Sequence, residues 1–350
     1  MRITVHGAGI IGLACADELC RRGHDVSVTD PSAGMGASHA AAGMLSPSTE
    51  AWWDDTALLD LGTRSLALWP AFAARLGVRL TASGTVLAAR DHGDLQQVER
   101  QLGLLAAHGQ RVDLLSAKEV TALEPALTVR VAGGALLPDD HSVDPRAVVS
   151  ALLARVPLVS AQQAAGEDVD VTILATGSTL PDPWSHLIRG VRGEIVRARL
   201  SDGRPARTIR GWVRGQPVYV VSRPNGDVVI GATSEEHDGE PIVTVGGVGR
   251  LLEAARELVP ALDRAEFTEA IARHRPASPD HLPLIGPAPW VPTVPSTGGT
   301  VLLATGLYRH GVLLAPLTAQ LVADCVETGT TEPSVDPRRI HAVPTSGALT

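Results

Sequence analysis

Three glycines near the amino terminus have the spacing of a phosphate-binding loop. Gly7, Gly9 and Gly12 follow a short apolar strand over residues 2–6 and open a helix that Gly23 ends. In such a loop the first glycine allows a tight turn, the second lets the backbone approach a pyrophosphate, and the third lets the helix pack close to the strand. The strand and helix on either side distinguish this motif from a chance match.

The same unit offers groups to the rest of a dinucleotide. The helix expected over residues 13–22 presents free N–H groups and a partial positive charge at its start to the phosphates, and Ile10 and Ile11 of the loop are expected to contact the cofactor. Residues 25–29 alternate as a second strand, and Asp30 after it can accept hydrogen bonds from the two ribose hydroxyls of an adenosine. Because an acid here disfavours a 2′-phosphate, the unit fits FAD or NAD rather than NADP.

Further elements must position these groups. Residues 169–175 are an apolar, β-branched run ending in a Thr-Gly pair, which is typical of a buried parallel strand that meets a ligand at its carboxyl end. A last strand over 301–304 precedes a second Thr-Gly pair and a helix over 311–328. In the strand-rich middle, an Asn-Gly pair at 225–226 indicates a hairpin turn. Strands are expected at 85–89, 134–137, 194–199, 217–222 and 227–232, and helices at 58–76, 94–108 and 248–259.

This order predicts an α/β (α+β) fold with a discontinuous, Rossmann-like dinucleotide-binding domain and an antiparallel-sheet substrate domain. The expected limits are 1–78, 140–190 and 276–330 for the first domain, 79–139 and 191–275 for the second, and 331–350 for a flexible tail.

Composition argues against a nucleic-acid-binding protein, a membrane-spanning protein and a metal-binding protein. The net charge is −8 and no run of Lys and Arg forms a stripe, so nucleic acid is not an expected partner. No apolar stretch approaches the ~20 residues of a membrane helix. Cys15, Cys20 and Cys325 lack the spacing of a metal or redox pair. We therefore expect a cytoplasmic protein with reduced thiols, no membrane span and no bound metal.

The segment 34–45 is small and almost uncharged, which suits either a large flat cofactor or a Gly/Ala helix packed on the sheet. Its part A-S-H-A-A-A-G-M-L at 37–45 resembles the flavin-contacting segment of the D-amino-acid oxidase superfamily, and of the glycine oxidase branch in particular. R-H-R-P-A-S-P-D, followed by L-P-L-I-G within 273–286, and A-T-G-L-Y-R-H-G-V-L-L-A-P at 304–316 resemble the same branch. The three blocks occur in the family's order and span nearly the whole chain.

The resemblance implies that the first domain binds FAD, and that it does so without a covalent bond. His39 is one residue out of register with the histidine that carries covalent flavin in some relatives. Residues 311–314 correspond to a helix start that faces the pyrimidine end of the flavin ring. Beyond the glycine loop and Asp30, the residues expected at FAD are Ser38, Ala42, Gly43, Met44, Thr176, Gly177, Arg275, Gly306, Tyr308, Arg309, His310, Gly311, Val312 and Leu313.

The resemblance also implies a substrate site. Arg275 corresponds to the arginine that pairs with the substrate carboxylate, and Tyr219 to the tyrosine that reaches the same carboxylate. Arg309 corresponds to a second arginine near flavin and substrate, and Met44 to a methionine beside the pocket. These residue types suit the task, because a guanidinium grips a carboxylate through two parallel hydrogen bonds.

The implied reaction is the oxidation of glycine or another small amino acid, such as sarcosine or a D-amino acid, by molecular oxygen. Its products are the 2-oxo acid, ammonia or an amine, and hydrogen peroxide. The resemblance implies that the reaction serves thiazole synthesis for thiamine. The alternatives are a dehydrogenase with a non-oxygen acceptor, a non-catalytic flavin-binding protein and an NAD-dependent dehydrogenase. A homo-oligomer is compatible with the resemblance.

Three features depart from the family pattern. Ser234 stands where relatives carry methionine, and Pro217 stands where a histidine occurs, so strict glycine preference is in doubt. The stretch 156–170 is shorter than usual beside the adenine side of FAD, and we expect looser FAD binding. Trp52 and Trp53 are expected to pack between the domains, with a lid over the pocket as the alternative.

Overall fold

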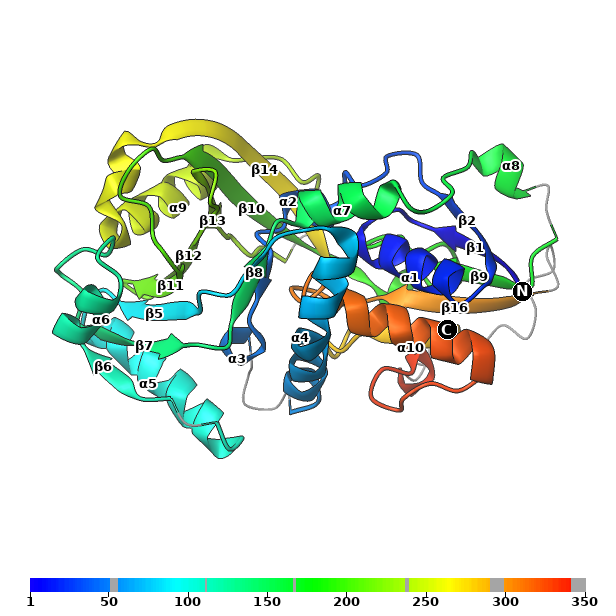
Figure 1. The fold of residues 1–350 in the computed structure, drawn as a ribbon, viewed down its shortest axis with the longest axis horizontal. Coiled ribbons are helices and arrows are strands. Elements are labelled where there is room, and N and C mark those ends of the chain that lie inside the picture. The colour runs from blue at the N-terminus through cyan, green and yellow to red at the C-terminus, as the bar shows by residue number, and fades with distance from the viewer. Residues whose placement is uncertain (51–55, 111, 166–167, 237–238, 290–298, 341–350) are drawn as a thin grey trace, which may run out of the picture.

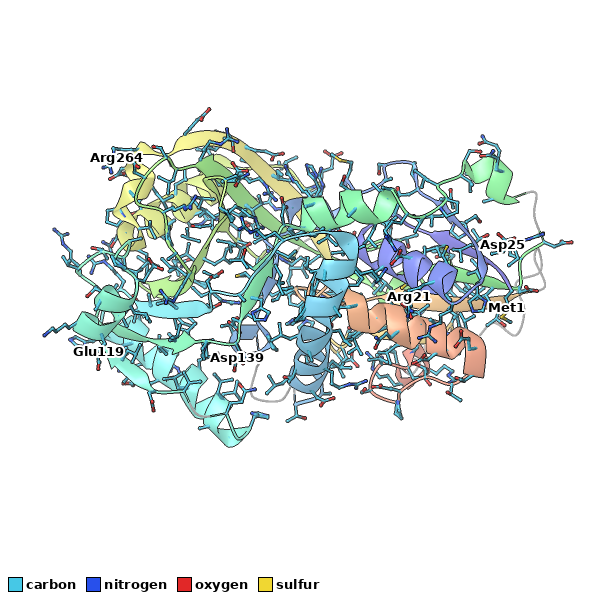
Figure 2. The ribbon with its side chains drawn as sticks, viewed as in Figure 1. Met1, Arg21, Asp25, Glu119, Asp139 and Arg264 are labelled. Atoms are coloured by element: carbon cyan, nitrogen blue, oxygen red, sulfur yellow. The ribbon has the colours of Figure 1, made fainter. Side chains whose placement is uncertain are left out.

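The computed structural model describes residues 1–350 except 51–55, 111, 166–167, 237–238, 290–298 and 341–350. Two lobes lie side by side, with the long helix α4 (Thr56–Leu76) between them (Figure 1). The predicted packing of Trp52 and Trp53 falls outside the described residues. Charged side chains such as Glu119 and Arg264 lie at the outer edge of the molecule (Figure 2).

The first lobe contains a five-stranded sheet of order β15-β16-β9-β1-β2. The strands β2, β1, β9 and β16 are parallel to one another, and β15 is antiparallel at the edge. Their bounds are β1 Arg2–His6, β2 Asp25–Thr29, β9 Val171–Leu174, β15 Leu284–Pro287 and β16 Thr300–Thr305.

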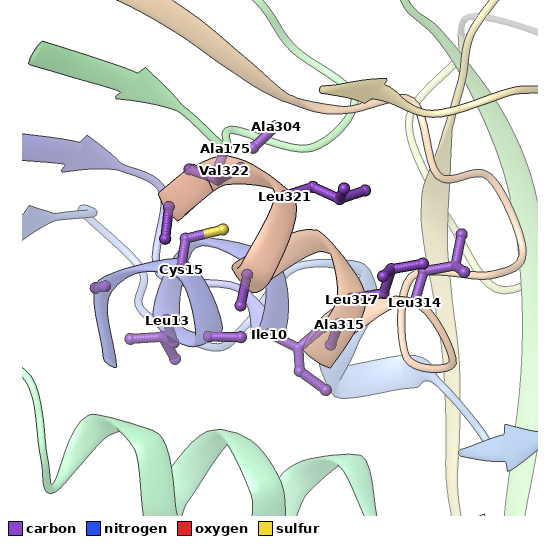
Figure 3. Close-up of a cluster of buried hydrophobic side chains, with 14 of the residues drawn as sticks. Ile10, Leu13, Cys15, Ala175, Ala304, Leu314, Ala315, Leu317, Leu321 and Val322 are labelled. Atoms are coloured by element: carbon purple, nitrogen blue, oxygen red, sulfur yellow. The ribbon is translucent and has the colours of Figure 1, made fainter. Parts of the chain in front are cut away.

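One face of this sheet is covered by α1 (Ile10–Arg21), α7 (Pro145–Leu153) and α10 (Ala315–Thr328). Figure 3 shows Leu13 and Cys15 of α1, and Leu317 and Val322 of α10, among the side chains of one buried apolar cluster. Pro316 lies in the first turn of α10, where its missing N–H costs no intrahelical hydrogen bond. The helix ends at Gly329 in the left-handed conformation, with φ of 72°.

The second lobe contains an eight-stranded sheet of order β14-β10-β13-β12-β11-β5-β7-β6. Its pairings are antiparallel apart from that of β11 with β5. Helix α9 (Val245–Leu258) covers one face of the sheet, and α5 (His92–Ala107) and α6 (Ala117–Leu123) pack near β5 and β7. The strand bounds are β5 Thr85–Ala89, β6 Leu114–Ser116, β7 Gly133–Leu137, β10 Arg189–Arg199, β11 Thr208–Val213, β12 Gln216–Ser222, β13 Asp227–Gly231 and β14 Glu266–Ala277.

A small third sheet has the strand order β3-β8-β4, and its three strands come from separate parts of the chain. Its strands are β3 Met44–Leu45, β8 His141–Val143 and β4 Leu80–Thr81. The short helices are α2 Ala37–Ala40, α3 Pro47–Glu50, α8 Ala161–Ala165, η1 Ser185–Leu187, η2 Pro260–Arg264 and η3 Pro337–Arg339.

The predicted α/β class is confirmed, with a parallel Rossmann-like sheet and a largely antiparallel second sheet. The long strand β14 and the third sheet were not expected. Residues 332–340 are packed rather than loose, because Val335 is fully buried and its carbonyl accepts a hydrogen bond from Ile285 N–H. The domain limits stay a prediction. In the described part of the chain, no helix is long and apolar enough to span a bilayer.

Candidate functional site

A cavity of about 1290 Å³ runs from the glycine loop of the first lobe to a face of the eight-stranded sheet. The predicted site residues that line this cavity are Gly7, Gly9, Ile10, Ile11, Asp30, Ser38, Ala42, Gly43, Met44, Thr176, Gly177, Tyr219, Arg275, Tyr308, Arg309, His310, Gly311, Val312 and Leu313. Gly12 and Gly306 do not line it. Gly12 instead packs against the carbonyl oxygen of Gly7, where a Cβ would overlap it.

The glycine loop is held by hydrogen bonds from both sides. Gly7 has φ of 105°, a conformation that favours glycine. Asp30 accepts a hydrogen bond from Ala8 N–H at 2.7 Å, and the Ser38 hydroxyl accepts one from Ile10 N–H at 3.0 Å. Asp30 and the segment after Gly36 are therefore fixed relative to the glycine loop.

The opposite end of the cavity presents further backbone donors. The N–H groups of Gly311, Val312 and Leu313 donate to no acceptor in the part of the chain that the structure describes, although Val312 and Leu313 are buried. Such orphan donors in a cavity suit an anionic or carbonyl-bearing ligand. The predicted helix start at Gly311 is wrong, because residues 311–314 form a turn and α10 begins at Ala315. In this turn His310 N–H donates to the Leu307 carbonyl, and Leu314 N–H donates to the His310 carbonyl.

Arg275 and Tyr219 lie on one face of the sheet and lean over glycines of the strands between them. Tyr219 on β12 pairs directly with Gly231 on β13, and a Cβ at Gly231 would overlap the phenol. Arg275 on β14 crosses Gly193 on β10, where a Cβ would overlap the guanidinium. Because β10 and β13 are neighbours, both side chains extend inward over the same part of the sheet. Arg275 Nη1 also donates to the Thr233 carbonyl at 3.1 Å, which orients the guanidinium.

Gly193 and Gly231 were missed by the sequence analysis. A glycine inside a strand often marks a place where another group approaches the backbone closely. That signal was available at both positions but does not say which side chain approaches.

The third predicted side chain, Arg309, is attached to the end of β14. Tyr308 N–H donates to the Pro276 carbonyl at 2.7 Å, directly after Arg275 in the chain. The guanidinium of Arg309 lies 5.0 Å from the centre of the Tyr308 ring and donates to the Ser234 hydroxyl at 3.3 Å. Ser234, which stands where relatives carry methionine, therefore places a polar group beside Arg309 at the wall of the cavity.

The segment 39–42 is anchored by arginines that the sequence analysis did not single out. Arg223 donates to the Ala42 carbonyl at 2.5 Å, and Arg146 donates to the His39 carbonyl at 3.0 Å. Burial lowers the pKa of Arg223 to about 10. Apolar side chains on the same sheet face pack against Ala40 and Ala42. The segment that lines the cavity is thus fixed to the eight-stranded sheet.

His39 points away from the cavity. Its Nε2 atom lies 3.8 Å from a carboxylate oxygen of Glu269, and the residue is not part of the cavity wall. Burial, followed by the nearby Arg146, lowers the pKa of its imidazole. This placement fits non-covalent FAD, because no histidine side chain from this segment reaches the cavity.

A buried carboxyl supports the wall near Met44. Asp140 is 3% exposed and accepts a hydrogen bond from the Ser46 hydroxyl, which also contacts Thr49 Oγ1 at 2.7 Å. Burial raises the pKa of Asp140 to about 6. Arg210 on β11 donates to Thr49 Oγ1 at 2.9 Å and lines the cavity. Within the described ranges, no three His, Cys, Asp or Glu side chains gather as a metal site.

Comparisons with known proteins agree with this geometry. The profile of a family described as FAD dependent oxidoreductase, DAO, matches residues 2–325. A bifunctional protein ThiO/ThiG of Trichormus variabilis is 31% identical over 95% of this chain and 53% of its own length, so the chain spans about half of that relative. A putative thiamine biosynthesis oxidoreductase ThiO of Rhizobium etli is 33% identical over 92% of this chain and 95% of that protein.

Among solved structures, a glycine oxidase from Geobacillus kaustophilus superposes with a TM-score of 0.80 at 28% identity, covering 96% of each chain. These matches confirm the predicted resemblance to the D-amino-acid oxidase superfamily.

Proposed function

The chain belongs to the FAD dependent oxidoreductase family, DAO, and from that premise we propose that it oxidises glycine or another small amino acid. Sarcosine and small D-amino acids are the other candidate substrates. The products are the 2-oxo acid, ammonia or an amine, and hydrogen peroxide, with molecular oxygen as the electron acceptor. The names of the relatives ThiO and ThiO/ThiG support a place in thiamine biosynthesis.

The cavity suits FAD held by hydrogen bonds. The glycine loop and the start of α1 would hold the pyrophosphate, and Asp30 would hold the ribose. The orphan N–H groups of Gly311, Val312 and Leu313 would bind the carbonyl edge of the flavin ring. When bound, FAD supplies the two-electron acceptor for the amine.

The observation that carries the proposal is the convergence of Arg275 and Tyr219 over Gly193 and Gly231. A planar guanidinium binds the substrate carboxylate through parallel hydrogen bonds, and the phenol adds another. Holding the substrate by its carboxylate fixes the position of its Cα, and positioning of this kind lowers the barrier by up to ~7–11 kcal/mol in ideal cases. Arg309 adds a second positive charge at the same end of the cavity.

The decisive experiment is anaerobic mixing of the FAD-loaded protein with glycine, sarcosine and D-alanine. We expect one of them to bleach the visible flavin band, and air to restore the band with formation of hydrogen peroxide. Bleaching without peroxide, but with turnover of an artificial acceptor, would support a dehydrogenase instead. Absence of bleaching by any amino acid would support a non-catalytic flavin protein, and a colourless protein that FAD cannot reconstitute would support an NAD enzyme.

A pair of variants tests the carboxylate assignment. Arg275→Ala should slow bleaching at least tenfold at low substrate, because the carboxylate loses its bidentate partner. Arg100→Ala, at an exposed position of α5, should leave it unchanged. Equal rates in the two variants would refute the role of Arg275.

A further inference from the structure

The two faces of the parallel sheet differ in polarity beside the glycine loop. On one face, Ile3 and Val5 of β1 are fully buried against α1 and α10. On the other face the same strand carries Thr4 and His6. Parallel strands are normally apolar on both faces, because helices or other layers cover both. The alternation in β1 therefore indicates that something other than an apolar layer meets its second face.

The polar positions of neighbouring strands lie in register. Thr4 pairs with Ser27 on β2 and with Thr172 on β9, and Thr4 Oγ1 lies 3.2 Å from Ser27 Oγ. His6 pairs with Thr29 on β2 and with Leu174 on β9. The pairing makes a polar surface on the β1–β2 half of this face.

The β9–β16 half of the same face is covered by apolar side chains. Leu174 and Leu303, on β9 and β16, pack against Leu180, Trp184 and Leu187. The apolar cover stops there. On the β1–β2 side, Thr4, His6, Thr29 and Thr172 line the cavity instead.

The segment that borders this polar surface runs beside β2 at the edge of the sheet. Its described part makes an isolated parallel bridge between Val28 and Leu158, and then the five-residue helix α8. Ala161 and Ala164 of α8 and Asp168 after it line the cavity. The cavity therefore extends past Asp30 between a polar half-sheet and a small helix.

His6 is the largest side chain on the polar surface. It immediately precedes Gly7 and lies in the cavity wall, and its imidazole makes no hydrogen bond to the described residues. Burial lowers the pKa of the imidazole, so the ring is neutral near pH 7 and can donate through one nitrogen and accept through the other.

We propose that His6 binds the adenosine half of FAD, on the polar surface formed with Thr4, Thr29 and Thr172. The inference rests on FAD binding as stated in the proposed function. The order of groups along the cavity supports it: the phosphates belong at the glycine loop, the ribose at Asp30, and the purine beyond them. A neutral imidazole matches a purine in two ways, as a flat ring and as a donor and acceptor of hydrogen bonds.

The test compares two flavins that differ in the adenosine half. Apoprotein is titrated with FAD and separately with FMN, and bound flavin is measured by ultrafiltration and absorbance, so that no substrate or turnover is needed. For His6→Ala we expect the Kd for FAD to rise about tenfold, which corresponds to about 1.4 kcal/mol. The Kd for FMN should stay within about twofold of the wild-type value, because FMN has no adenosine to lose a contact.

His92→Ala, at an exposed position on α5 in the other lobe, is the matched control and should change neither Kd. An unchanged FAD affinity in His6→Ala would overturn the proposal, and so would an equal loss of FAD and FMN affinity. If His6→Ala does not fold, His6→Phe and His6→Asn replace it. The proposal then requires at least one of them to weaken FAD binding selectively, and it fails if neither does.

The outcome is separable from that of the proposed function. A wild-type protein that binds FAD but is not bleached by any amino acid refutes the function and leaves the adenosine contact open to this titration. A wild-type protein that binds no FAD refutes both.

Discussion

The guanidinium of Arg275 lies directly against the backbone of Gly193, so closely that a Cβ on the glycine would overlap Nη1 and Nη2. The two residues are on neighbouring strands, β14 and β10, and Arg275 pairs with Val191 rather than with Gly193. The side chain therefore runs along the strand to reach the space that the glycine leaves. A residue without a side chain thus decides where the carboxylate-binding group lies.

Gly193→Ala should displace Arg275 from this position. We expect the KM for the amino acid to rise at least tenfold with little change in the FAD spectrum, because the methyl group occupies the place of the guanidinium. Steady-state kinetics and the visible spectrum measure the two effects. Gly249→Ala is the control, since a Cβ there meets no atom within 4 Å. An unchanged KM in Gly193→Ala would show that Arg275 acts from elsewhere.

Arg223→Met should weaken FAD binding without touching the cavity wall. The substitution leaves the Ala42 carbonyl without its arginine donor, and an unsatisfied buried carbonyl costs about 1–3 kcal/mol. We expect a lower free energy of unfolding and a Kd for FAD raised several-fold, measured by urea unfolding and flavin titration. Arg199→Met, whose side chain is 58% exposed and pairs with Asp227, should change both values little. Equal behaviour of the two variants would contradict the anchoring role.

Asp140 should make stability depend on pH between about 4 and 6. Its folded-state pKa of about 6 lies above the ordinary value of 3.8, because burial disfavours the charge. A raised pKa means that the contribution to stability is complete below the unfolded-state pKa and is lost as the pH rises through the folded-state pKa. Asparagine imitates the neutral carboxyl and does not titrate. As the pH rises across this window, the free energy of unfolding of Asp140→Asn should therefore increase relative to that of the wild type, by on the order of 2–3 kcal/mol.

Urea unfolding of the apoprotein at several pH values measures this gain. Asp139→Asn, at the exposed neighbouring position, is the control and should follow the wild type. Parallel pH profiles for wild type and Asp140→Asn would show that Asp140 does not titrate in this window.

The thiols should be inert in the native protein. Cys15 and Cys325 are buried, Cys20 is partly buried, and burial raises the pKa of Cys15 to about 12. Since the thiolate is the reactive form, little of it is present at pH 8. We expect a thiol reagent to react slowly with the native protein and to count three thiols after unfolding. Fast labelling of Cys15 would indicate that α1 opens readily.

Local patterns in the sequence predicted the first lobe well. Strand β1 and strand β2 were expected at the bounds that the structure shows, and Gly7 and Gly9 lie between strand and helix as predicted, whereas α1 begins at Ile10 and so includes Gly12. These features are local: apolar alternation, a positive φ at Gly7 and a helix start within a few residues. Arg275, Tyr219 and Arg309 came from a family resemblance, and the structure places all three at the cavity. Their roles toward substrate and FAD stay predictions.

The sequence by itself determined where the chain can bend closely around a phosphate, because that depends on glycines a few residues apart. Only the tertiary structure decided what faces those residues. The carbonyls of the segment 39–42 are held by arginines more than a hundred residues away in the chain, Arg275 reaches over Gly193 from another strand, and His6 faces a cavity rather than a layer of apolar side chains. Such relationships depend on sheet order and register, which bring distant residues together and leave no periodic signal in the local sequence.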